Sequence, residues 1–164
     1  MATREIQVQR FSVSCSKVFE DVVARIDAAI GHPDMKAFGE GVTAAKTYSE
    51  LEKIISNLVG PPGLMEFARF DLGAILRKQR GTEAPKILRL VVGNPLIMKR
   101  MVEHVPDAGS YAPVTIFVDE RADGVHVSYD RMASFLAPYG NAEALAVARD
   151  LDSKVEALLT AATS

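Results

Sequence analysis

The chain has 164 residues, of which 48% are hydrophobic and 24% charged, with a formal net charge of −2. This length predicts a single domain over residues 1–164, and the missing basic run argues against nucleic-acid binding. No apolar run approaches the roughly 20 residues that span a bilayer, so no membrane segment is expected. The segment 1–5 does not resemble a signal peptide, and we expect a cytoplasmic protein. The single cysteine, Cys15, excludes an internal disulfide and a multi-cysteine metal site.

The first third of the chain predicts a strand, a helix and a long loop. Alternation over residues 5–13 predicts the strand, with a change of phase near Gln9. Apolar residues at three- and four-residue spacing predict a helix that Ser16 caps and Gly31 ends. Residues 32–46 lose this periodicity, so we expect a loop that is either a lid or disordered.

The middle of the chain predicts a second helix and two strands. Thr47 and Glu50 have the spacing of a capping box, and the helix they open ends before Gly60. Residues 65–77 alternate, which predicts a strand or a strand running into a short helix, with Ala68 and Phe70 on its apolar face. The apolar run 87–92 predicts a central strand buried on most of both faces.

The last third predicts a helix, a hairpin and a final helix. The first of these helices follows Gly93-Asn94-Pro95 and ends at Pro106, and the hairpin turns at Asp123-Gly124. Residues 131–140 are expected to form a loop, and a C-terminal helix over 141–164 follows. This order predicts an α+β fold, in two layers, with a mostly antiparallel sheet and helices packed on one face.

The Gly93-Asn94-Pro95 junction is the first candidate site. Asn94 is a good N-cap and Pro95 a good first helical residue. Such a helix start directs backbone N–H groups and the positive end of the helix dipole at an anion above the strand end. The alternative is that Asn94 caps its own helix for stability alone.

Charged residues on two strands form the other candidates. Arg69 and Asp71 share a strand face and could line a pocket, or form a solvated edge. His126 lies on the hairpin between acidic and hydroxyl residues, but i, i+2 neighbours on a strand stand roughly 7 Å apart, too far for a catalytic triad. We expect a polar hairpin face there, with Asp71 or His126 as acid or base in the alternative that the protein is an enzyme. The histidine spacings predict no metal site.

From Phe67 to Pro138 the chain resembles an uncharacterised family, the domain of unknown function 302. The matching segments, in order, are Phe70-Asp71, Gly81, Val91-Val92-Gly93-Asn94-Pro95, Ala112-Pro113 and Asp123-Gly124-Val125-His126-Val127-Ser128-Tyr129-Asp130. The resemblance implies a small two-layer α/β domain, often paired as a homodimer, and no established reaction. It covers a family-like core of about residues 5–140, which makes the C-terminal helix over 141–164 an added element suited to dimer contacts. Three residues depart from the family pattern, namely Leu72, where many relatives have His, Ala112 and Arg131.

Three functions therefore stay open. The first is a small-ligand-binding module acting as a homodimer, with an anionic metabolite held at Gly93 and Asn94 and a wall formed by Asp71, Arg69 and Tyr129. The second is a structural or interaction domain without a ligand. The third is an enzyme that needs no cofactor, and no cofactor is expected for any of the three.

Overall fold

The computed structural model describes residues 3–164. The prediction that residues 1–5 are not part of a signal peptide falls partly on Met1 and Ala2, which lie outside the described residues. The regular elements are β1 (Arg10–Cys15), α1 (Phe19–Ala29), α2 (Met35–Ala44), α3 (Tyr48–Ser56), β2 (Met65–Asp71), α4 (Gly73–Arg80), β3 (Ile87–Gly93), α5 (Pro95–Val102), β4 (Val114–Arg121), β5 (Gly124–Asp130), α6 (Met132–Leu136) and α7 (Ala142–Thr163). Short 3₁₀ turns occupy Gly81–Glu83, Pro106–Ser110 and Ala137–Tyr139.

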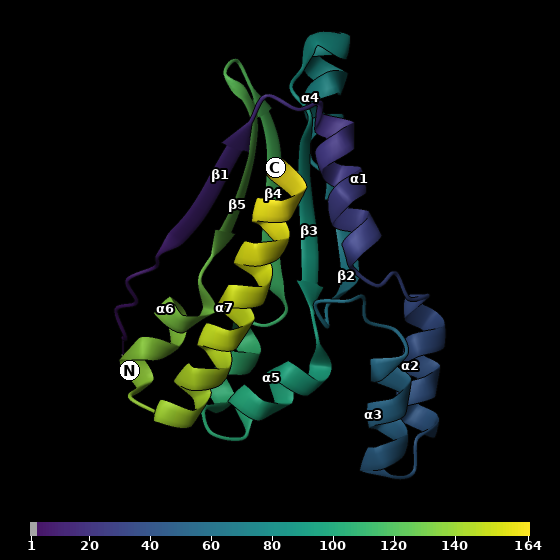
Figure 1. Cartoon of the computed structure of the whole chain (residues 1–164), viewed down its shortest axis with the longest axis vertical. Coiled ribbons are helices and arrows are strands. Elements are labelled where there is room, and N and C mark those ends of the chain that lie inside the picture. The colour runs from purple at the N-terminus through teal and green to yellow at the C-terminus, as the bar shows by residue number, and fades with distance from the viewer. Residues whose placement is uncertain (1–2) are drawn as a thin grey trace.

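The strands form one five-stranded sheet in the order β1-β5-β4-β3-β2. Every neighbouring pair is antiparallel. Figure 1 shows α1 and α7 lying over one face of this sheet, with α5 crossing below α7. The predicted α+β class, with an antiparallel sheet and helices on one face, is confirmed.

The core lies between the sheet and these helices. Leu90, Ile116 and Tyr129 stand opposite one another on β3, β4 and β5, and all three are buried. The alternate residues of the same strands point to the other face, where Arg89 is exposed and Phe117 half-buried. The expectation that residues 87–92 are buried on both faces is therefore wrong, because helices cover only one of them.

Two predicted boundaries at the N-terminal end are also wrong. β1 begins at Arg10 rather than at residue 5, because the backbone of Gln9 binds residues at the start of α6. The Gln9 N–H donates to Ser134 Oγ at 3.1 Å, and the Gln9 carbonyl accepts from the Arg131 N–H at 2.9 Å. α1 has Val18, not Ser16, at its N-cap, and no side chain caps it.

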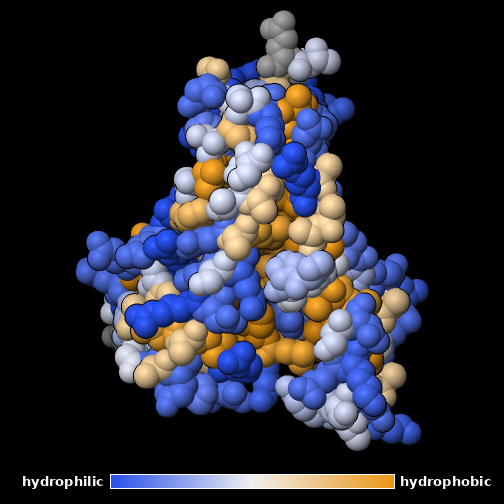
Figure 2. Space-filling view, viewed as in Figure 1, coloured by the Kyte–Doolittle hydropathy of each residue, from blue (hydrophilic) through white to orange (hydrophobic). Residues whose placement is uncertain are grey.

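The segment 32–46, expected to be a loop, contains α2. Asp34 caps this helix, accepting from the Ala37 N–H at 2.8 Å. No residue of α2 is buried, which explains why the segment shows no clear apolar stripe. Together α2 and α3 form a helical pair that stands away from the sheet (Figure 1), and this pair forms a protruding lobe in the space-filling view (Figure 2). The Thr47 half of the predicted capping box is confirmed, because Thr47 Oγ1 accepts from the Glu50 N–H. The Glu50 carboxylate accepts from the Lys46 N–H at 2.7 Å, and not from the Thr47 N–H as the capping box predicts.

The segment 131–140, also expected to be a loop, contains α6. The start of α6 is capped by a residue far along the chain: Asp152 of α7 accepts from the N–H groups of Met132 and Ala133 at 2.7 and 3.1 Å. A cap supplied from another helix leaves no local sequence signal.

A bulge in β2 decides which side chains of this strand face the helices. The strand runs into α4, as one of the two predictions stated. Its register shifts between Glu66 and Ala68, so Arg69 stands opposite Leu90 on the helix-covered face, and Phe70 stands opposite Arg89 on the other. The predicted burial of Ala68 and Phe70 is therefore reversed, because one extra residue moves every later side chain to the opposite face.

Candidate functional site

The predicted helix start at Gly93-Asn94-Pro95 is confirmed at the end of β3. Asn94 caps α5, and its Oδ1 accepts from the Leu96 N–H at 2.8 Å. Its Nδ2 donates to the carbonyl of Gly63 at 2.8 Å, in the turn that precedes β2. Both ends of the Asn94 amide are thus bound to the chain itself, and the residue ties α5 to the turn before β2.

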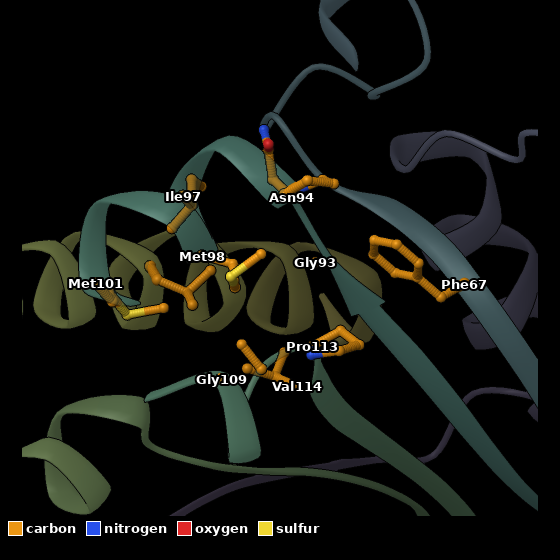
Figure 3. Close-up of a pocket in the computed structure, with 12 residues that line it drawn as sticks. Phe67, Gly93, Asn94, Ile97, Met98, Met101, Gly109, Pro113 and Val114 are labelled. Atoms are coloured by element: carbon orange, nitrogen blue, oxygen red, sulfur yellow. The ribbon is translucent and has the colours of Figure 1, made fainter. Parts of the chain in front are cut away.

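A cavity of about 160 Å³ lies beside this junction. Figure 3 shows Phe67 on one side of it, α5 side chains on the other, and the start of β4 below. Its lining is mostly apolar and consists of Phe67, Gly93, Asn94, Pro95, Ile97, Met98, Met101, Gly109, Ala112, Pro113, Val114 and Leu151. We call this cavity the Asn94 pocket.

Gly93 is required by the close packing of the Asn94 pocket wall. A Cβ atom on Gly93 would lie 3.1 Å from Pro113 Cβ and 3.6 Å from the Phe67 ring. A side chain here would therefore require Pro113 to shift by a few tenths of an ångström. The glycine of the sequence motif serves packing between these two strands.

The charges near the Asn94 pocket do not face into it. Lys99 pairs with Glu103 at 2.7 Å on the outer side of α5, and Arg100 is exposed. Neither residue lines the cavity. The chemistry of the walls therefore favours an apolar ligand group over the anion that the sequence predicts.

Arg69 and Asp71 lie in a different cavity, a cleft of about 700 Å³ between α1, β2 and the segment before β3. Arg69 pairs with Asp27 of α1 and, at 2.7 Å, with Glu66. Asp71 accepts from Arg77 of α4 at 2.5 Å, and this guanidinium lowers the pKa of the carboxyl. The two residues thus bind separate partners, and they do not share a cavity with Asn94.

Tyr129 is a core residue. Its ring is 1% exposed, and its hydroxyl donates to Asp152 Oδ1 at 2.5 Å. Burial, followed by the charge of Asp152, raises the pKa of Tyr129. The same carboxylate caps α6, so Tyr129 belongs to a buried network that joins β5, α6 and α7.

The residues of the enzyme hypothesis are not brought together. Asp71 points to the helix-covered side of the edge strand β2. His126 lies on the opposite face of β5, where its Nε2 is 2.9 Å from Asp123 Oδ1 in the hairpin turn. Ser128 and Asp130 follow it at alternate positions of the same face, as the hairpin pattern predicts.

A third group of polar residues had no signal in the sequence. Asp27, His32 and Glu66 bring potential metal-ligand atoms within 4.8 Å of one another. The guanidinium of Arg69 binds both carboxylates, and His32 Nε2 lies 2.9 Å from the Asp27 carbonyl. The group forms an arginine-centred ion-pair network that joins α1 to β2.

Comparison with known protein families finds a match that includes most of the segments described above. A family model described as "Domain of unknown function DUF302" matches residues 40–162. The chain belongs to the DUF302 family. The match contains the Asn94 pocket residues, the β4–β5 hairpin and nearly all of α7, so α7 lies within the family domain.

A solved structure has the same fold as this DUF302 protein. It is the crystal structure of an uncharacterized conserved DUF302 protein from Bacillus stearothermophilus, with a TM-score of 0.63 and 12% identity. The similarity covers 94% of this chain and 98% of that one. At this identity the likeness shows a common fold. Comparison with curated proteins finds no match.

Within residues 3–164 of this DUF302 protein, none of the helices has the length and apolar character needed to cross a bilayer. The expected homodimer and the cytoplasmic location stay predictions.

Proposed function

We propose that this DUF302 protein is a small-ligand-binding module whose ligand places an apolar group in the Asn94 pocket. The observation that supports this most is the pocket itself, about 160 Å³ of mostly apolar space at the β3–α5 junction. An engineered apolar cavity of about 150 Å³ in another protein holds benzene, so a group of that size fits.

The walls suit a ligand of variable shape. Met98 and Met101 carry flexible thioether side chains that fill irregular gaps and contact aromatic rings favourably. Phe67 offers a ring on the opposite side, and it packs edge to face with Phe38 of α2, at 6.4 Å between centroids and 78° between planes. α2 therefore contacts a wall residue of the pocket without lining it, which supports a covering role for the segment 32–46.

Thermal unfolding in the presence of small apolar compounds tests the proposal. We expect toluene, indole or a similar compound to raise the melting temperature of the wild type, because a ligand that binds only the folded state stabilises it. Met98→Trp fills the pocket and is expected to abolish that rise. The control is Ile75→Trp, a position that is 72% exposed on α4 and does not line the pocket.

Two results would contradict the proposal. One is the absence of any shift across the set of compounds. The other is an equal shift in the wild type and in Met98→Trp, which would place the compounds elsewhere.

A further inference from the structure

An arginine lies between two aromatic rings on the sheet face that α1 and α7 leave uncovered. Phe70, Arg89 and Phe117 stand opposite one another on β2, β3 and β4. Phe70 is 47% exposed, and Arg89 is exposed. The β2 bulge creates this row, because it moves Phe70 to the uncovered face beside Arg89.

Arg89 has no carboxylate partner among the side chains that the structure describes. The polar contact of its guanidinium is with Thr115 Oγ1, at 3.4 Å. Its guanidinium carbon lies 5.8 Å from the centre of the Phe70 ring. By contrast, Arg10 on the same face holds Asp130 through two bonds of 2.6 and 2.8 Å.

The surface around Arg89 is hollowed on both sides. Hollows of about 390 and 250 Å³ share Arg89, Thr115 and Asp130 as lining residues. One extends over Phe117 and the start of β1. The other ends at a wall formed by Tyr111 and Phe135, whose rings stack with centroids 4.8 Å apart and planes at 13°.

We propose that Arg89 and its aromatic neighbours bind a planar small molecule, a ring that carries one carboxylate or phosphate group. A guanidinium matches the two oxygens of such a group, and the pair forms strong charge-assisted bonds. The flat ring would contact the phenylalanine faces and the stacked wall. Asp130 also lines both hollows, and its pairing with Arg10 offsets its negative charge, which leaves the charge of Arg89 available to the ligand's anionic group.

This site is distinct from the Asn94 pocket, although Pro113 and Val114 contribute to the walls of both. The pocket takes an apolar group on the α5 side, whereas the Arg89 site offers a charge on the uncovered sheet face. Either site could exist without the other, so variants must separate them.

Titration calorimetry with 2-naphthoate and its neutral relative 2-naphthol tests the proposal. We expect naphthoate to bind the wild type more tightly than naphthol, with an affinity that falls as salt is raised. Arg89→Gln removes the charge at an exposed position, and about a tenfold or greater loss of naphthoate affinity is expected. Arg100→Gln, an exposed arginine of α5 that lines neither hollow, should bind naphthoate as the wild type does. Phenyl phosphate in place of naphthoate distinguishes a phosphate from a carboxylate preference.

Three outcomes would overturn the proposal. The first is naphthol binding as tightly as naphthoate. The second is a naphthoate affinity in Arg89→Gln equal to that of the wild type. The third is a dimer in light scattering that Arg89→Gln dissociates, which would show that a second copy covers this face. Retention of the toluene effect in Arg89→Gln would leave the Asn94 pocket proposal standing.

Discussion

At the scale of single residues, Asp152 has a structural role that the sequence did not predict. Its carboxylate is buried and accepts three bonds, from the Tyr129 hydroxyl and from the N–H groups of Met132 and Ala133. Burial raises the pKa of Asp152, and the three donors oppose that rise. One side chain therefore joins β5, the start of α6 and the middle of α7.

Replacing Asp152 by alanine should destabilise the protein strongly. Asp152→Ala leaves the Tyr129 hydroxyl and the Ala133 N–H without their acceptor, whereas the Met132 N–H keeps the Tyr129 hydroxyl oxygen at 3.1 Å. Each unpaired buried group costs roughly 1–3 kcal/mol. We expect the free energy of unfolding in urea to fall by about 3 kcal/mol or more. Asp150→Ala, an exposed neighbour paired with Lys154, is the control and should lose less than about 1 kcal/mol. Similar losses in both variants would contradict this role.

Asn94 and Arg89 show that the hydrogen-bond and ion-pair partners of a side chain determine its role. Asn94 matches the sequence prediction of an N-cap, and its second bond, to Gly63, also makes it a link between α5 and the turn before β2. Arg89 interrupts a predicted apolar strand, and the sequence gives no reason to single it out. Yet it lies at the middle of the uncovered sheet face, and no carboxylate among the described side chains pairs with it.

At the scale of elements, α2 and α7 differ most in how much of each helix is buried. α2 has no buried residue, and its start depends on the Asp34 cap. α7 buries one whole face, including Leu151, Val155 and Leu159. A helix without buried apolar contacts opens at low free energy, whereas a core helix opens with the whole domain.

Loss of the Asp34 cap should therefore affect α2 alone. Asp34→Ala removes the acceptor for the Ala37 N–H, which costs a helix about 1 kcal/mol. We expect amide hydrogen exchange to become several-fold faster in α2, with no change in α7 and little change in melting temperature. A fall in melting temperature as large as that of Asp152→Ala would show that α2 unfolds with the core.

At the scale of the whole molecule, α7 completes the core rather than extending from it. It packs against α1, α5 and α6 and over β1 and β5. The expectation that this helix is an added element is wrong, because its apolar face is used within the chain. A homodimer, as the family resemblance implies, would therefore not use the apolar face of α7.

A chain that ends at residue 140 should not fold. Without α7 the sheet loses the helix that covers Tyr129, and α6 loses its cap from Asp152. We expect no cooperative thermal transition by circular dichroism. The whole chain carrying Ser153→Ala, on the exposed side of α7, is the control and should melt as the wild type does. A cooperative transition in the shortened chain would contradict this account.

The sequence by itself determined the elements whose signals are local. The Asn94 cap, the Asp123-Gly124 turn, the Thr47 cap and the apolar stripe of α7 all depend on residues within a few positions of one another, and together they predicted the α+β class. The family motifs agreed with this class.

Only the tertiary structure decided which residues meet. The β2 bulge turned Arg69 toward the helices and Phe70 toward Arg89, and Asp152 capped α6 from 20 residues away. The tertiary structure also places Arg69 and Asp71 in a different cavity from Asn94, although the sequence analysis assigned all three to one ligand site. Such contacts depend on register and packing between distant segments, and neither periodicity nor spacing along the chain records them.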